Sequence, residues 1–142
     1  MNDNLISILI IMNKKEFIEA KDLKVYQLAR QLSKLAWEIY ESLSWQDKKI
    51  MGDQFIESTD SVGANIIEGY GRYHYLDKIR FYYIARASLN ESAIHWLELL
   101  LDRNKINHEQ YKEMIDVAKD LQVKLNNFIG TTYNQYKKSK KQ

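Results

Sequence analysis

The sequence predicts an all-α fold, an up-down-up-down four-helix bundle within one domain. Apolar residues recur every three or four positions over four long stretches, which is the period of an amphipathic helix. The 142 residues include no proline and only five glycines, so little interrupts regular structure. The segments between the four stretches are short, as in bundles whose consecutive helices run antiparallel.

The first helix is expected over residues 23–43, and the second helix follows it closely. The apolar face of the first contains Val25, Leu28, Leu32, Leu35, Ile39 and Leu43. Ser44 and Asp47 resemble a capping pair at the start of the second helix. The second helix is expected to end at Gly69, and its apolar stripe contains Met51, Phe55, Thr59, Val62 and Ile66.

The third helix is expected to begin near Tyr75 and to run to about Asp102. Its wide apolar face contains Ile79, Tyr82, Tyr83, Ala85, Leu89, Ala93, Trp96, Leu97 and Leu100. Asn107 and Gln110 form another capping pair, which starts the fourth helix. That helix is expected to reach Gly130 or somewhat past it, with an apolar stripe of Tyr111, Ile115, Ala118, Leu121, Leu125 and Phe128.

The chain divides into a lead segment (1–22), the bundle (23–136) and a basic tail (137–142). The apolar run 5–12 in the lead is too short to span a bilayer, and its flanking residues do not suit a signal peptide. It is expected to be helical or extended and to pack on the body or on a neighbouring subunit, unless translation begins at Met12. The absence of cysteine suits a cytoplasmic protein, and no membrane association is expected.

The formal net charge of +2 is unevenly distributed. Four cations lie in the last six positions: Lys137, Lys138, Lys140 and Lys141. Without these four, 17 basic residues remain against 19 acidic ones, so the body is not a globally basic nucleic-acid binder. The tail indicates either affinity for a polyanion or a solvated, frayed end.

The stretch ANIIEGYGR, residues 64–72, has the most unusual local pattern. Asn65 and Glu68 are three apart and share a face of the second helix. Gly69 is expected to adopt the left-handed conformation just past the helix end. The stretch is interpreted as a structural corner that sets the angle between the second and third helices. Direct contact with an RNA or protein ligand is the alternative.

Glu68 is expected to need a cationic partner. The helix dipole disfavours a carboxylate in the last turn by about 0.3–1 kcal/mol. Arg72 is the nearest cation in the sequence, and Arg86 on the next helix is the second candidate. Glu68→Ala is therefore expected to lower stability or to break an oligomer.

Two linked motifs resemble a known family. SVGANIIEGYGR (61–72), followed by FYYIARASLNES (81–92), is similar to the bacterial four-helix-bundle proteins encoded within 23S rRNA intervening sequences. The resemblance extends from about residue 23 to 128. Gly63 stands where that family usually has proline, and Ala93 stands where many relatives have glutamate. The matching residues are Asn65, Ile66, Glu68, Gly69, Gly71, Arg72, Ala85, Ser88, Leu89 and Glu91.

The resemblance implies a small cytosolic bundle that assembles into a homo-oligomeric ring, commonly a pentamer. It also implies association with ribosomal RNA, as a non-enzymatic RNA binder or an oligomeric scaffold that needs no cofactor. By the same resemblance, a motif corner is organised by Asn65, Glu68, Gly69, Gly71, Arg72, Arg86, Ser88 and Glu91.

Aromatic and basic residues alternate around the turn between the second and third helices. The aromatics are Tyr70, Tyr73, Tyr75, Tyr82 and Tyr83, and His74 lies among them. Such a surface stacks bases and binds phosphates, or forms a subunit interface, which is the favoured reading. The candidate RNA contacts are Arg72, Tyr73, Lys78, Arg80 and the four tail lysines, Lys137, Lys138, Lys140 and Lys141.

Enzymatic and metal chemistry find little support. A di-iron bundle uses Glu-x-x-His pairs on facing helices, whereas Glu91 and His95 are spaced by four and stand alone, so no metal is predicted. RNKINH (103–108) has the Arg-Asn-x-x-x-His spacing of the HEPN ribonucleases, which cleave RNA without metal at a site shared by two subunits. In that alternative Arg103 and His108 are the catalytic pair, with His108 as general base.

Overall fold

The computed structural model describes residues 2–8 and 18–141, and all regular secondary structure in these ranges is helical. The prediction of an all-α fold is confirmed for this part of the chain. A short helix covers residues 3–8. Half of the apolar run 5–12, residues 9–12, and with it the alternative start at Met12, lie outside the described residues.

Four uninterrupted helical stretches follow a single 3-10 turn, η1 (Ala20–Asp22). The first is α2 (Lys24–Ser42). The second joins α3 (Trp45–Asp47), the π-helix η2 (Lys48–Gly52) and α4 (Asp53–Tyr70). The third joins α5 (Tyr75–Asn90), the π-helix η3 (Glu91–Trp96) and α6 (Leu97–Asp102), and the fourth is α7 (His108–Lys140). Most of the observed helix ends agree with the ends that were expected from the sequence.

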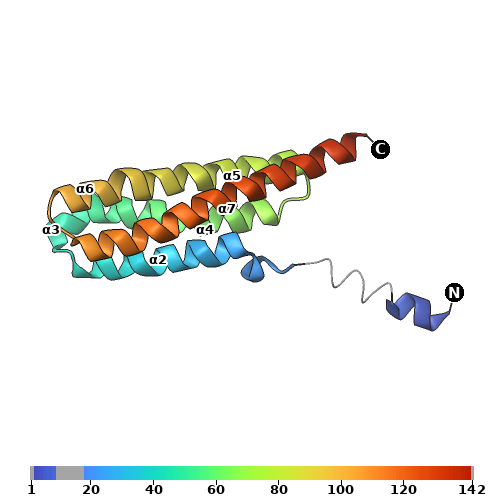
Figure 1. Ribbon diagram of the computed structural model, residues 1–142, viewed down its shortest axis with the longest axis horizontal. Coiled ribbons are helices and arrows are strands. Elements are labelled where there is room, and N and C mark those ends of the chain that lie inside the picture. The colour runs from blue at the N-terminus through green and yellow to red at the C-terminus, as the bar shows by residue number, and fades with distance from the viewer. Residues whose placement is uncertain (1, 9–17, 142) are drawn as a thin grey trace.

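The four stretches lie side by side along the long axis of the molecule (Figure 1). The helix α4 packs against α2 and α5, and α7 packs against the same two helices from the other side. The short connections alternate between the two ends of the molecule (Figure 1). Consecutive stretches therefore run in opposite directions around one core.

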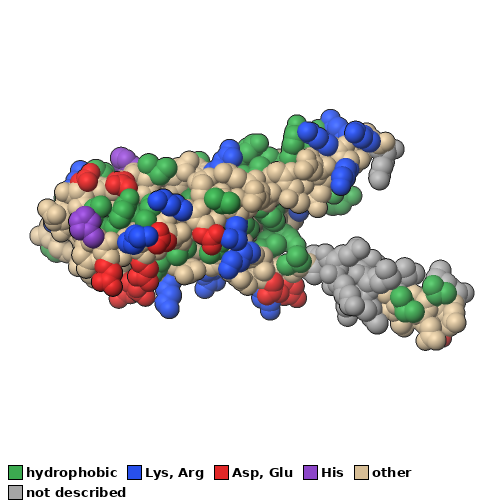
Figure 2. Space-filling model, viewed as in Figure 1, with side chains coloured by type: hydrophobic (Ala, Val, Ile, Leu, Met, Phe, Trp, Pro, Cys, Tyr) green, Lys and Arg blue, Asp and Glu red, His purple; other side chains and the backbone are tan. Residues whose placement is uncertain are grey.

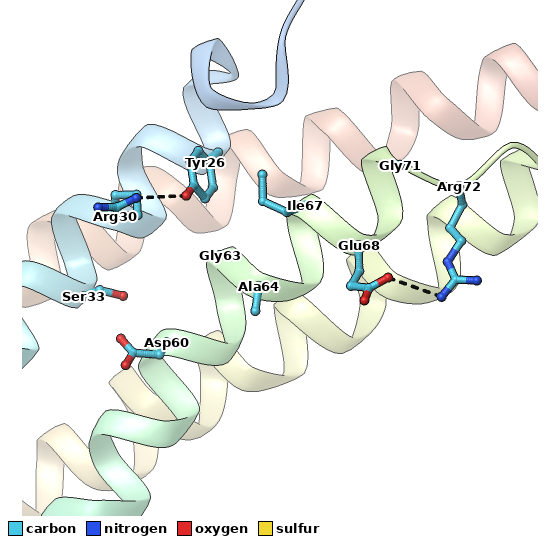
Figure 3. A pocket seen from close by; sticks show the side chains of 10 residues that line it. All are labelled: Tyr26, Arg30, Ser33, Asp60, Gly63, Ala64, Ile67, Glu68, Gly71 and Arg72. Atoms are coloured by element: carbon cyan, nitrogen blue, oxygen red, sulfur yellow. Dashed lines mark hydrogen bonds and ion pairs between the residues drawn. The ribbon is translucent and has the colours of Figure 1, made fainter.

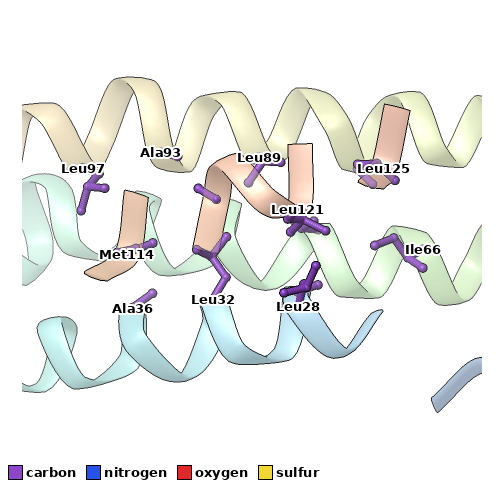
Figure 4. Packing of buried hydrophobic residues seen from close by; sticks show 14 of the residues in the cluster. Leu28, Leu32, Ala36, Ile66, Leu89, Ala93, Leu97, Met114, Leu121 and Leu125 are labelled. Atoms are coloured by element: carbon purple, nitrogen blue, oxygen red, sulfur yellow. The ribbon is translucent and has the colours of Figure 1, made fainter. Parts of the chain in front are cut away.

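The core contains the stripes that helical periodicity predicts (Figure 4). The five residues of the second stripe are all 2% exposed or less: Met51, Phe55, Thr59, Val62 and Ile66. Met114 was not part of the stripe predicted for the fourth helix, yet it is fully buried beside Leu121 and Leu125. The assignment of Tyr83 to the apolar face was wrong. Its side chain is 48% exposed.

Both predicted caps are present. The Asp47 amide donates to Ser44 Oγ at 3.2 Å. The Gln110 amide donates to Asn107 Oδ1 at 2.8 Å, and the Asn107 amide donates to Gln110 Oε1 at 3.0 Å. These bonds satisfy amide groups that a helix start leaves without an intrahelical partner.

The fourth helix is longer than its predicted end at Gly130 or somewhat past it. It continues to Lys140, so three lysines of the basic tail, Lys137, Lys138 and Lys140, belong to α7. Ile129 and Thr132 are buried on either side of Gly130, which holds the helix against the core beyond the glycine. The helical tail then extends past the other helices (Figure 1).

Gly69 does not have the left-handed conformation that the sequence suggested. It lies inside α4, and no glycine among the described residues has a positive φ. A Cβ at Gly69 would lie 2.6 Å from Tyr82 Cε1 and 2.9 Å from the Lys78 carbonyl oxygen. Glycine is therefore required here because α4 and α5 approach too closely for a side chain.

Gly69→Ala is expected to lower the free energy of unfolding by about 1–3 kcal/mol, because the added methyl group collides with the α5 backbone. Gly130→Ala is the matched control. Nothing lies within 4 Å of its added Cβ, so helix propensity alone raises stability by about 0.5–1 kcal/mol. Urea unfolding of both variants checks the pair. An unchanged or raised stability for Gly69→Ala contradicts the steric account.

Candidate functional site

A groove of about 850 Å³ lies between α2 and α4 (Figure 3). Small and apolar side chains of α4 form much of its surface, and Arg30, Asp60, Glu68 and Arg72 add two charges of each sign. Half of the motif stretch 61–72 therefore borders one groove. The lining residues are Tyr26, Arg30, Ser33, Asp60, Gly63, Ala64, Ile67, Glu68, Gly71 and Arg72.

Other motif residues contact α5 instead. Asn65 Nδ2 donates to the Ser61 carbonyl oxygen at 2.8 Å and to Ser61 Oγ at 2.9 Å. Ser61 Oγ and Ser88 Oγ are 2.9 Å apart and share a hydrogen bond. Ser61 thus connects Asn65 with Ser88 across the α4–α5 interface. Ser61 was not among the predicted site residues, although its spacing of four from Asn65 was a usable signal.

Glu68 pairs with Arg72, the nearer of its two candidate partners. Arg72 Nη2 lies 3.3 Å from Glu68 Oε2, and the two side chains are 44% and 59% exposed. Arg86 instead donates to Asn126 Oδ1 at 3.3 Å. No hydrogen bond or ion pair in the described part of the chain links Glu68 to Glu91, which is itself exposed. The residues of the motif corner are therefore divided between the groove and the α4–α5 contact.

A second pocket, of about 560 Å³, lies at the end of the molecule where α7 finishes. Tyr73 and Lys78 line it from the α4–α5 turn and the start of α5, and Tyr136 lines it from α7. Figure 2 shows lysine and arginine side chains gathered around this end. The structure thus brings together two candidate RNA-binding regions that lie far apart in the sequence. The lining residues are Tyr73, His74, Tyr75, Leu76, Lys78, Tyr136 and Ser139.

Cations and tyrosine rings alternate along the end of α7. Lys137 Nζ lies 4.7 Å from the centroid of the Tyr133 ring, and Lys140 Nζ lies 4.9 Å from that of Tyr136. The interaction of Lys140 with the Tyr136 side chain raises the pKa of its ammonium group. Tyr136 was missed in the sequence, although the repeated Tyr–Lys spacing of four was its signal.

The other candidate RNA contacts differ in whether their charged groups already bond to other groups of the protein. Lys78 Nζ donates to the Tyr70 carbonyl oxygen at 2.7 Å, and burial lowers the pKa of this ammonium. Arg80 pairs with Asp77 at 3.6 Å. Arg72 and Arg80 both lie over the Phe81 ring, with Cζ at 4.7 and 5.4 Å from its centroid. Lys138 and Lys141 are exposed.

The two residues of the ribonuclease alternative lie on either side of the connection between α6 and α7. Arg103 Nη1 donates to Met51 Sδ at 3.6 Å, and His108 is the first residue of α7. No hydrogen bond joins Arg103 to His108 within the described ranges. The described residues also contain no group of three or more histidine, aspartate or glutamate side chains placed to hold a metal ion. Among the same residues, no helix is long and apolar enough to cross a membrane.

The described residues form a small all-α protein with two open surface pockets. The sequence profile of one family, described as 23S rRNA-intervening sequence protein, matches residues 21–127. The chain belongs to this family, which confirms the resemblance seen in its motifs.

One similar solved structure is a protein with unknown function from the S23 ribosomal protein family of Bacteroides thetaiotaomicron. It is 28% identical to this chain with a TM-score of 0.69, and the match covers 74% of this chain and 97% of the other. No curated protein matches the chain.

Glu68→Ala is expected to lower the free energy of unfolding by no more than about 1 kcal/mol, because an exposed ion pair is screened by water and salt. Urea unfolding at low and high salt measures this, with the effect shrinking at high salt. Glu91→Ala, an exposed glutamate of the same motif, is the control. A loss of several kcal/mol for Glu68→Ala contradicts this reading and indicates a contact with another subunit.

Proposed function

We propose that this protein binds RNA without cleaving it, through the end of the molecule formed by the α4–α5 turn and the end of α7. The supporting observation is the pocket that combines Tyr73 and Lys78 with Tyr136. Aromatic rings beside cations suit nucleic acid, because rings stack on bases and cations bind phosphates. The description of the family points to ribosomal RNA as the ligand.

Four lysines at the C-terminal end of the chain, called the α7 lysines below, supply most of the attraction in this proposal. The chain without Lys137, Lys138, Lys140 and Lys141 carries more acidic than basic residues. Helical structure holds three of these lysines in a fixed array at one end. Phosphate contacts of this kind provide affinity without sequence specificity, and they weaken as salt increases. A cytoplasmic location follows from this role, since ribosomal RNA is found there.

The proposal includes assembly of four-helix bundles into a homo-oligomeric ring, a pentamer by family resemblance. The alternating connections of the four helical stretches support the up-down-up-down arrangement (Figure 1). Trp37, Ile94 and Val123 are 50%, 64% and 59% exposed, and they offer apolar surface for subunit contacts. A ring would repeat the basic end once per subunit, so that one RNA could contact several copies.

Replacing Lys137, Lys138, Lys140 and Lys141 with glutamine is expected to weaken RNA binding and flatten its salt dependence. The magnitude of the slope of log affinity against log salt should fall by up to about 3, because each lost contact with a phosphate of a single strand lowers it by about 0.7. Anisotropy of a labelled ribosomal RNA fragment at several salt concentrations measures both effects. The matched control replaces four exposed lysines elsewhere with glutamine: Lys34, Lys49, Lys112 and Lys119. Equal losses in the two variants contradict the proposal.

RNA recovered from these mixtures is expected to be intact on a denaturing gel. Metal-free protein and a prolonged incubation make the assay sensitive to the HEPN type of cleavage. Shortened RNA with the unmodified chain, but not with Arg103→Ala or His108→Ala, contradicts the non-enzymatic role. It would instead favour the ribonuclease alternative.

The mass of the protein in solution is expected to be a multiple of the 16.9 kDa chain. Ile94→Glu should reduce this mass if Ile94 contacts another subunit, because a buried charge without a partner opposes association. The side chain is 64% exposed in the single chain, so its replacement should leave the helices folded. Analytical ultracentrifugation and circular dichroism test the two points. A monomeric wild-type protein contradicts the ring.

A further inference from the structure

We infer that the pocket between the α4–α5 turn and α7 binds an unpaired base, so that the RNA recognised at this end is single-stranded. This inference rests on the proposed function, because it names the kind of RNA that the same end binds. It concerns a specific site, whereas the α7 lysines attract any polyanion. An experiment can therefore contradict the base pocket and still support the attraction by the lysines.

The walls of the pocket are aromatic and come from two directions. Tyr73, His74 and Tyr75 line it from the α4–α5 turn and the start of α5, and Tyr136 lines it from α7. Tyr73 is 90% exposed, and its ring meets His74 edge-on, with centroids 5.1 Å apart and planes at 85°. The ring of Tyr73 is thus accessible to a ligand. Such a ring stacks on any base, since every base has an aromatic face.

The size and charge of the pocket suit a base with its flanking phosphates. A volume of about 560 Å³ falls in the range of small-ligand sites. None of its described lining residues is acidic, and Lys78 contributes a cation. The nearest acidic side chain in the sequence, Asp77, is paired with Arg80. Lys140 lies over the Tyr136 ring, where it can meet a phosphate next to a stacked base.

A base within a duplex does not meet these requirements. Its two faces are covered by neighbouring base pairs, and the deep, narrow major groove of an RNA helix excludes side chains. Aromatic side chains stack on bases in single strands, loops and ends, where a base can leave the stack. The duplex would still contact the α7 lysines through its phosphates. The pocket therefore distinguishes the two forms of RNA, whereas the lysines do not.

The test compares a labelled oligouridine with a blunt RNA duplex of the same nucleotide count, using the full chain. Tyr73→Ala and Tyr136→Ala are each expected to weaken oligouridine binding about tenfold, the typical effect of losing one stacked base. Tyr73→Phe and Tyr136→Phe keep a ring and should retain most of the affinity. All four variants should bind the duplex as the unmodified chain does.

Two exposed aromatic residues outside the pocket provide matched controls. Tyr133→Ala removes a ring from the same helix, and Trp45→Ala removes one from α3 at the opposite end of the molecule. Neither should change the preference for oligouridine. Tyr73 is in an exposed turn, so Tyr73→Ala decides the matter if Tyr136→Ala lowers the melting temperature of the helices.

Unchanged oligouridine binding by Tyr73→Ala, or an equal loss of oligouridine and duplex binding, overturns the base pocket. Salt-sensitive binding that depends on the α7 lysines would then still support the proposed function. If the unmodified chain binds neither RNA at low salt, both the base pocket and the proposed function are overturned.

Discussion

The close approach of α4 and α5 at Gly69 is the constraint on which the α4–α5 interface and the pocket beside its turn depend. With no side chain at this position, the α4 backbone lies against Tyr82 and the carbonyl oxygen of Lys78. That approach brings Ser61 and Ser88 within hydrogen-bonding distance farther along the same interface. It also sets the position of the turn that follows α4, and therefore of Tyr73 beside Tyr136. A packing requirement thus determines where the surface chemistry lies.

The fold could be predicted because its causes are local in the sequence. Periodic apolar residues specify which face of each helix is buried, and the Ser44 and Asn107 caps mark where two stretches begin. Even Thr59 fits its apolar stripe, because its hydroxyl donates to the Phe55 carbonyl oxygen and Ser92 Oγ lies 2.5 Å away. That pairing satisfies a polar group that would be costly to bury alone. The π-helical stretch η3, which carries Ser92, has no comparable signal.

The candidate sites were harder to predict because they depend on distances between helices. Gly69 looked like a helix terminator, since a glycine near the end of an apolar stripe has the same sequence signature whether it ends a helix or permits close packing. Likewise, the motif residues form one run in the sequence, yet helical periodicity distributes them over two surfaces. Asn65 bonds toward Ser61 and α5, whereas Glu68 borders the groove with α2. The spacing of these residues alone did not show which neighbouring helix each face of α4 would contact.

The helical state of the basic tail changes what its charges can do. In a frayed tail, each lysine would lose considerable conformational freedom on binding a phosphate. In α7, the backbone of Lys137, Lys138 and Lys140 is already ordered, so binding costs less entropy. The same helix holds Tyr136 beside the α4–α5 turn. In the proposed RNA site, long-range attraction by the lysines and short-range contact in the pocket would thus be coupled through one helix. The order of α7 beyond Gly130 is therefore as important to the proposed RNA site as the number of its charges.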